Sequence, residues 1–193
     1  MTPTIRFITH PDVAIDPAVP VPQWPLSATG RARMRAGLAQ PWVTHIGAIW
    51  CSTERKAIDA AAILSDATSI GFTTLDALGE NDRSATGFLP QAEFEATADL
   101  FFAHPTHSIR GWEPAADAQA RIVAALDCVL ASTPADLDIV ILAHGGVGAL
   151  LICALENLPI SRAHDQPAGQ GGHYFAIDRR TRLLRHGWEQ FDA

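Results

Sequence analysis

The sequence predicts an α/β protein, a three-layer α/β/α sandwich whose mostly parallel central sheet is covered by helices on both faces. Three apolar runs have the length and the β-branched content of buried strands: Ile5–Thr9, Ile46–Cys51 and Ile139–Ala143. They alternate with longer segments of helical periodicity, an alternation typical of parallel sheets that are buried on both sides. With 193 residues, 48% of them hydrophobic, the chain is expected to form one domain over residues 1–193.

Capping residues and apolar stripes define the helices between these strands. Ser27 is expected to cap a helix over Ala28–Ala39, which ends before Pro41. Ser52 or Thr53 is expected to cap the next helix, whose apolar residues recur at helical spacing: Ala57, Ala60, Ala61 and Leu64. Three more helices are expected over Gln91–Ala103, over Pro114–Ser132 and from the glycines after His144 to Leu155. The remaining elements are a proline-rich loop over 11–25, a short strand over 72–75, a polar loop over 78–90 and a terminal hairpin of 174–177 with 183–186.

Composition and charge exclude several classes of partner. The net charge of −7 disfavours nucleic acids and anionic membranes, because both select basic surfaces, but it still permits a small anionic ligand. The uncharged stretch Ile139–Leu155 is short for a membrane span and contains glycines, so a strand, a turn and a helix explain it better. Three cysteines without C-x-x-C spacing, and a first segment without a secretory pattern, indicate a cytoplasmic protein with reduced thiols.

Two histidines stand where predicted strands end. His10 follows the first strand, and His144 follows the third. Because ligands bind outside the carboxyl ends of strands in open α/β sheets, these imidazoles are expected to meet in one crevice and to carry nucleophilic or acid–base chemistry. His104 and His107 have H-x-x-H spacing but lack an obvious third ligand, so they are interpreted as surface loop residues. No metal site and no cofactor are expected.

Five short motifs accompany these histidines in order along the chain. They are Phe7-Ile8-Thr9-His10-Pro11, Pro25-Leu26-Ser27-Ala28-Thr29-Gly30, Ser52-Thr53-Glu54-Arg55-Lys56-Ala57, Leu78-Gly79-Glu80 and Leu142-Ala143-His144-Gly145-Gly146. The series resembles the histidine phosphatase superfamily, the phosphoglycerate-mutase-like group. Its motifs are a strand ending in Arg-His-Gly, then Pro-Leu-Ser-x-x-Gly, Ser-x-x-x-Arg-Ala, Leu-x-Glu, and a strand ending in His-Gly-Gly.

The resemblance implies a phosphoglycerate-mutase-like fold and a metal-independent phosphatase. In this scheme His10 accepts the phosphoryl group and His144 stabilises it from the opposite side. Glu80 protonates the leaving oxygen and later activates water, with Asp82 as the alternative. The amides of Gly145 and Gly146 at a helix N-terminus supply neutral donors, and Arg55 or Lys56 supplies a cation.

Two residues depart from the first motif of that family. Thr9 stands in place of the arginine and Pro11 in place of the glycine. A hydroxyl cannot replace a bidentate guanidinium on phosphate oxygens, so another cation is expected to compensate. The candidates are Arg6, which shares the strand parity of His10 but lies about 13 Å away along an extended chain, and also Arg83 and Arg33. In a gap-free match the second family arginine falls on Lys56, with Arg55 one place earlier.

Three other functions compete with the phosphatase hypothesis. A relative that binds a phosphorylated ligand without turnover fits the altered motif. A mutase is disfavoured because the chain is short for the insertions that cover a mutase's substrate. A serine hydrolase is disfavoured because the sequence has no G-x-S-x-G motif. The expected partner is a small phosphorylated substrate or inorganic phosphate, whose identity, like the oligomeric state, does not follow from the sequence.

Overall fold

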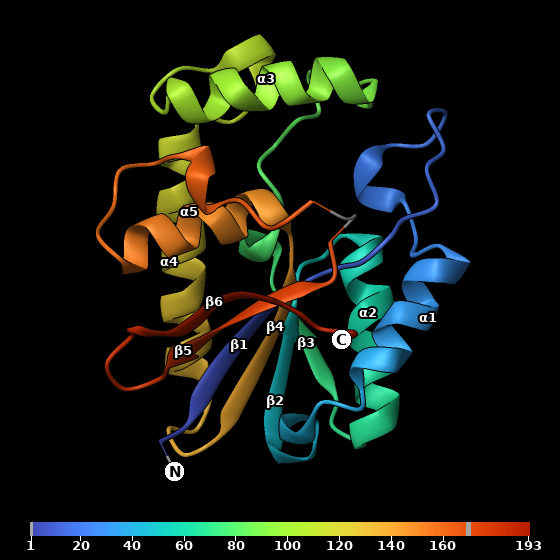
Figure 1. Ribbon diagram of the computed structural model, residues 1–193, viewed down its shortest axis with the longest axis vertical. Helices are drawn as coiled ribbons and strands as arrows, with labels where there is room; N and C mark the ends of the chain where they lie inside the picture. The colour runs from blue at the N-terminus through green and yellow to red at the C-terminus, as the bar shows by residue number, and fades with distance from the viewer. Residues whose placement is uncertain (1, 169–170) are drawn as a thin grey trace.

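A six-stranded mixed sheet forms the centre of the computed structural model, which describes residues 2–168 and 171–193 (Figure 1). The strand order is β3-β2-β4-β1-β5-β6. The strands are β1 (Thr4–Thr9), β2 (Ile46–Cys51), β3 (Phe72–Thr74), β4 (Asp138–Ala143), β5 (His173–Asp178) and β6 (Leu184–Gln190). The first four run parallel to one another, whereas β5 is antiparallel to β1 and β6 is antiparallel to β5.

Helices cover both faces of this sheet, as Figure 1 shows. The helices are α1 (Ala28–Gly37), α2 (Arg55–Thr68), α3 (Gln91–Ala103), α4 (Ala115–Ser132) and α5 (Gly145–Leu155). Five short 3-10 turns connect them: Val21–Gln23, Pro41–His45, Asp76–Leu78, Ile109–Gly111 and Arg162–His164. None of the described helices is both long and apolar enough to cross a membrane. The uncharged stretch that begins at Ile139 forms β4 and α5.

The core has three parts, one for each contact between layers. One cluster joins the sheet to α4 and α5, and a second joins the opposite face of the sheet to α1 and α2. A third cluster, which includes Phe101, Phe102 and Trp112, attaches α3 to the first turns of α4 and to α5. Helix α3 therefore lies beyond the carboxyl ends of the parallel strands, above the point where β1 and β4 end (Figure 1).

The predicted fold class is confirmed, with local differences at element ends. Ser27 caps α1 as predicted, since its Oγ accepts a hydrogen bond from the Gly30 amide, but the helix ends earlier than expected, at Gly37. Capping of α2 by Ser52 or Thr53 was wrong. Glu54 is the N-cap residue of α2, because Ser52 Oγ bonds the amide of Glu54 and the Thr53 hydroxyl donates to Asp76.

Candidate active site

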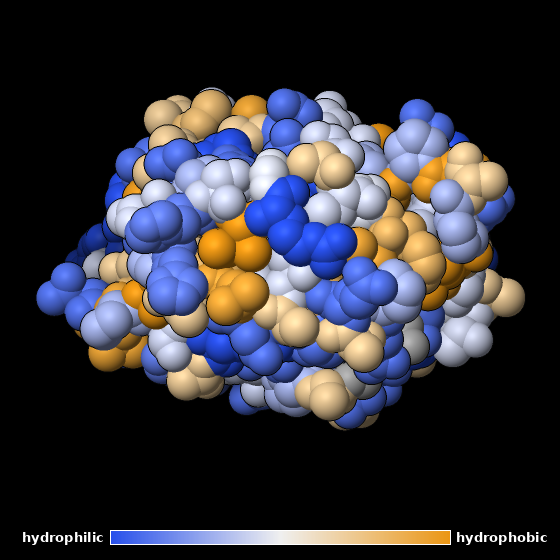
Figure 2. Space-filling view, turned by 90° about the horizontal axis from the view of Figure 1, so that it is seen from above, coloured by the Kyte–Doolittle hydropathy of each residue, from blue (hydrophilic) through white to orange (hydrophobic). Residues whose placement is uncertain are grey.

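A cavity of about 980 Å³ opens beside the carboxyl ends of β1 and β4, between the body of the protein and α3. Its floor includes His10, Glu80 and Gly145. Its walls come from the loop after β1, from residues 80–91, from α3 and from the segment that follows α5. Seen from above, apolar residues reach the surface near the middle of this face, beside strongly hydrophilic ones (Figure 2).

His10 stands immediately after β1, and its amide donates to the carbonyl of Ala143 at the end of β4 over 3.1 Å. Its ring Nδ1 lies 2.9 Å from the carbonyl oxygen of Pro11. A carbonyl can only accept, so Nδ1 carries the proton and Nε2 keeps its lone pair. Burial, and after it the charge of Lys56, lowers the pKa of His10 to about 4. The imidazole is therefore neutral at physiological pH.

His144 follows β4 and faces His10, with ring centroids 5.1 Å apart and the rings nearly perpendicular. Its Nε2 lies 2.9 Å from Ser52 Oγ and 3.3 Å from Glu54 Oε1. Burial lowers the pKa of this histidine well below its ordinary value. Its Nδ1 is buried and has no hydrogen-bond partner within residues 2–168 and 171–193.

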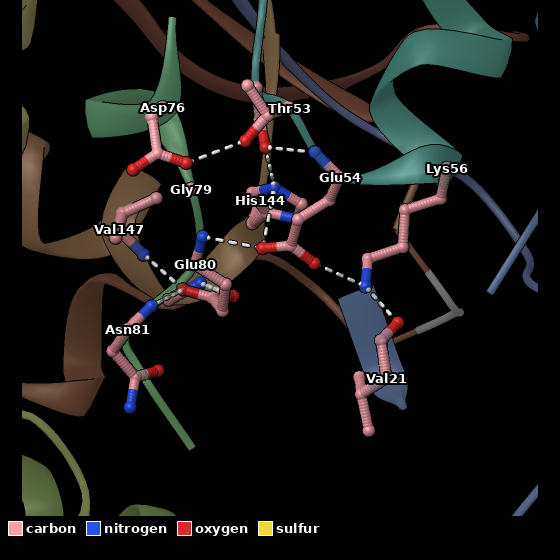
Figure 3. A network of polar contacts seen from close by, with 12 residues as sticks. Val21, Thr53, Glu54, Lys56, Asp76, Gly79, Glu80, Asn81, His144 and Val147 are labelled. Atoms are coloured by element: carbon pink, nitrogen blue, oxygen red, sulfur yellow. Dashed lines mark hydrogen bonds and ion pairs between the residues drawn. The ribbon is translucent and has the colours of Figure 1, made fainter. Parts of the chain in front are cut away.

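Glu54 is the centre of a polar network beneath the histidines (Figure 3). One carboxylate oxygen lies 2.6 Å from Lys56 Nζ, and the other lies near His144 and accepts the amide of Glu80 over 2.9 Å. Burial alone would raise the pKa of Glu54, but the neighbouring His144 and Lys56 outweigh it and hold the pKa at about 2. Glu54 is thus an ionised carboxylate that neutralises much of the charge of Lys56.

The structure brings Lys56 to this network and leaves Arg55 outside it. The Lys56 side chain is 4% exposed and donates to the Val21 carbonyl as well as to Glu54. Arg55 is 59% exposed and pairs with Asp59 one turn further along α2. A helix turns by about 100° per residue, so these consecutive side chains point in different directions, and only Lys56 is directed toward Glu54.

Glu80 holds the amino end of α5. Its carboxylate accepts the amides of Gly146 and Val147 over 3.1 and 3.0 Å, and it does not take the amide of Gly145. A Cβ added at Gly146 would lie 2.7 Å from Glu80 Oε1, so a larger residue would displace this carboxylate from its present position. Asp82, the alternative acid, is exposed and accepts the amide of Ser84 instead.

Comparison with known proteins assigns the family. The family model of the histidine phosphatase superfamily (branch 1) matches the sequence over residues 20–176, more than half of the chain. The chain belongs to the histidine phosphatase superfamily. The match includes Lys56, Glu80 and His144 but begins after His10. No curated protein matches the chain in sequence.

Solved structures of the same fold cover nearly the whole chain. A mycobacterial glucosyl-3-phosphoglycerate phosphatase, solved with inorganic phosphate, is 21% identical with a TM-score of 0.80 and 99% coverage of both chains. Bacillus stearothermophilus YhfR is 20% identical with a TM-score of 0.75 and coverage of 98% and 97%. A putative alpha-ribazole-5'-P phosphatase from Escherichia coli is 17% identical with a TM-score of 0.72 and 98% coverage of both chains. These likenesses confirm the phosphoglycerate-mutase-like fold.

The hydroxyl of Thr9, the residue before His10, is engaged within the protein. Thr9 Oγ1 donates to Gln166 over 2.7 Å and accepts the amide of His173 over 3.1 Å. Only 1% of Thr9 is exposed, and it does not line the cavity. Pro11 contacts the His10 ring through its backbone carbonyl, which any residue at this position carries.

Of the three arginines considered as replacements, only Arg83 lines the cavity. Arg6 lies nearer the opposite end of β1, paired with Asp138 and stacked on Trp42. Arg33 binds Asp12, Asp192 and the carbonyl of Gly171. Arg83 stacks over Phe94 and Trp112, with its guanidinium carbon 5.1 and 5.6 Å from the ring centroids, and its charge lowers the pKa of His10 and of His144.

Three residues at the site were not among those selected from the sequence: Glu54, Asn81 and Gln166. Asn81 lines the cavity, is 6% exposed, and its side-chain Nδ2 has no partner among the residues described. Gln166 joins Thr9 to the segment after α5. Glu54 had one signal in the sequence, since it lies inside the third of the five motifs, but the direction of its side chain depends on where α2 begins.

Proposed function

We propose that this protein is a metal-independent phosphomonoester hydrolase that acts through a phosphohistidine on His10. The observation that carries the proposal is the hydrogen bond from His10 Nδ1 to the Pro11 carbonyl, which leaves a neutral Nε2 with a free lone pair in a residue that lines the cavity. A neutral, oriented imidazole is the form that attacks phosphorus.

In the first step, Nε2 of His10 forms a bond to phosphorus while the bond from phosphorus to the alcohol oxygen breaks. Glu80 gives its proton to that oxygen, and the alcohol leaves. In the second step, the Glu80 carboxylate takes a proton from water as the water oxygen attacks phosphorus. The bond from phosphorus to nitrogen then breaks, and inorganic phosphate is released.

Several groups around His10 are suited to stabilise the transferred phosphoryl group. The amide of Gly145 lies at the positive end of the α5 dipole. Lys56 and Arg83 bring positive charge, although Lys56 is shared with Glu54. The buried Nδ1 of His144 has no partner among the described residues. Negative charge on both sides of the ring, from Glu54 and from the phosphoryl oxygens, favours its protonation, so that Nδ1 donates to a phosphoryl oxygen.

A second candidate is a relative that binds phosphorylated ligands without turning them over. Two observations favour it: the Thr9 hydroxyl is used inside the protein, and the Glu54 carboxylate offsets the charge of Lys56. Removing a single preorganised donor costs about 10²–10³ in rate in comparable sites.

Hydrolysis of p-nitrophenyl phosphate in EDTA between pH 4.5 and 8 tests the proposal. The wild type is expected to turn over and His10→Asn to lose turnover, while both remain folded by circular dichroism. Equal rates of turnover in the two proteins would contradict the role of His10, and no turnover in the wild type together with measurable phosphate binding would favour the binding protein.

A further inference from the structure

The part of the cavity beyond His10 is walled mainly by aromatic and aliphatic side chains. They come from four segments that are distant in sequence: Ile15, Trp24, Phe88, Leu89, Phe94, Ala98, Phe101, Phe102 and Trp112. Two of these residues, Trp24 and Phe88, contact each other, with ring centroids 5.7 Å apart. At about 980 Å³ the cavity lies at the upper end of the range for drug-sized ligands. The cavity therefore has room for an organic group as well as a phosphate.

The charges on the same walls disfavour a second anion in that organic group. The cations among the described lining residues are Arg83 and Arg162. Arg162 is already paired with Glu95, and it also contacts Asp99 and Asp165 over 2.5 and 3.5 Å. Glu95 and Asp165 line the cavity themselves. A carboxylate or second phosphate far from His10 would thus meet carboxylates and a cation that is already neutralised.

One polar group on these walls lacks a partner and points to how the ester is held. The side-chain Nδ2 of Asn81 is buried and has no hydrogen-bond partner in the part of the chain that the structure describes, although Asn81 lines the cavity next to Glu80. A buried donor without an acceptor destabilises the protein. A non-bridging phosphate oxygen beside Glu80 would satisfy it, and a phosphonate keeps such an oxygen.

We infer that the substrate is the phosphate monoester of a bulky apolar or aromatic alcohol without a second anionic group, and that Asn81 donates a hydrogen bond to it. The inference rests on the proposed function only in placing the phosphoryl group beside His10. It assigns the organic half of the substrate to the aromatic walls and a non-bridging phosphate oxygen to Asn81.

Binding of phosphonates, which cannot be hydrolysed, tests this inference independently of turnover. Calorimetric titration with 1-naphthylmethylphosphonate is expected to give at least about tenfold tighter binding than methylphosphonate, because the naphthyl ring removes apolar surface from water. A matched analogue with a carboxylate on the ring is expected to lose most of that gain. If the carboxylated analogue binds as tightly as the plain one, or if methylphosphonate binds as tightly as either, the inference is overturned.

Three variants locate the binding. Phe88→Ala and Asn81→Ala are expected to weaken binding of 1-naphthylmethylphosphonate about three- to tenfold. Asn81→Ala is also expected to weaken the binding of methylphosphonate. Phe88→Ala is not, because only the naphthyl ring is expected to contact Phe88. Leu100→Ala is the control, since Leu100 is 48% exposed on α3 and does not line the cavity. Equal losses in the control and in Phe88→Ala would overturn the placement of the ring. A wild type that binds these phosphonates in the expected order but hydrolyses no ester would contradict only the proposed function.

Discussion

Glu54→Gln is the substitution that most directly probes the network beneath the two histidines. Glutamine keeps the size of the side chain and an oxygen that accepts the Glu80 amide. It removes the negative charge that lies 2.6 Å from Lys56 and 3.3 Å from His144. A buried lysine is then left without its counter-charge.

The size of the effect follows from the pKa of Glu54. Holding that pKa at about 2 instead of 4.5 corresponds to roughly 3 kcal/mol of folding free energy at neutral pH. Breaking buried ion pairs in other proteins costs about 3–5 kcal/mol, which agrees. For a chain of this size the melting temperature is expected to fall by about 6–12 °C. Because the folded pKa is depressed, this contribution is present above pH 4.5 and is lost as the pH falls toward 2.

Thermal unfolding at pH 7, with and without inorganic phosphate, measures both consequences. Phosphate is expected to raise the melting temperature of Glu54→Gln more than that of the wild type, because Lys56 is then free to pair with it. Asp66→Asn is the control, since it makes the same charge change at an exposed position of α2. If Glu54→Gln melts within 2 °C of this control and gains no more from phosphate than the wild type does, the reasoning is refuted.

Three further predictions concern the cations and the nucleophile. Lys56→Ala is expected to lower kcat by about 10²–10³. Arg55→Ala, which removes an exposed ion pair with Asp59, is expected to keep kcat within about twofold of the wild type. Steady-state kinetics on p-nitrophenyl phosphate compares the two variants. The pH profile of kcat/KM is expected to hold as the pH falls through 6.5 and to decline only near 4, where His10 gains a proton and loses its lone pair; a decline centred on 6.5 would show that the nucleophile is not buried. Arg83→Met is expected to raise KM about tenfold and to move that decline to higher pH, because Arg83 lowers the pKa of His10; an unchanged profile would remove Arg83 from the site.

The sequence predicted the elements whose pattern is dictated by burial. Strand β2 and helix α3 have the predicted bounds, because β-branched runs and a proline before a helical stretch define their ends locally. The meeting of His10 with His144 followed from the parallel arrangement of β1 and β4, which brings their carboxyl ends to the same edge.

The sequence did not predict in which direction the side chains at the start of α2 point, or which loop residues face the cavity. The choice between Arg55 and Lys56 depends on the residue at which α2 begins, and Glu54 takes the N-cap position expected for Ser52 or Thr53. Asn81 and Gln166 lie in irregular segments, where no periodicity tells which side chains turn inward. Arg6 lies an even number of residues before His10, as expected for a side chain on the same face of β1. It is nevertheless too far from His10 along the strand, and it pairs with Asp138 instead.

A phosphoenzyme trap tests the central claim, phosphorylation of His10, most directly. The wild type is mixed with a ³²P-labelled aryl phosphate, quenched within milliseconds in alkaline denaturant that preserves phosphohistidine, and digested for peptide mapping. The account predicts label on the peptide that contains His10, none in His10→Asn, and more label in Glu80→Gln when the substrate carries a good leaving group, because hydrolysis of the intermediate then lacks its base. Turnover in the wild type with no label on that peptide, or unchanged turnover in His10→Asn, would contradict it.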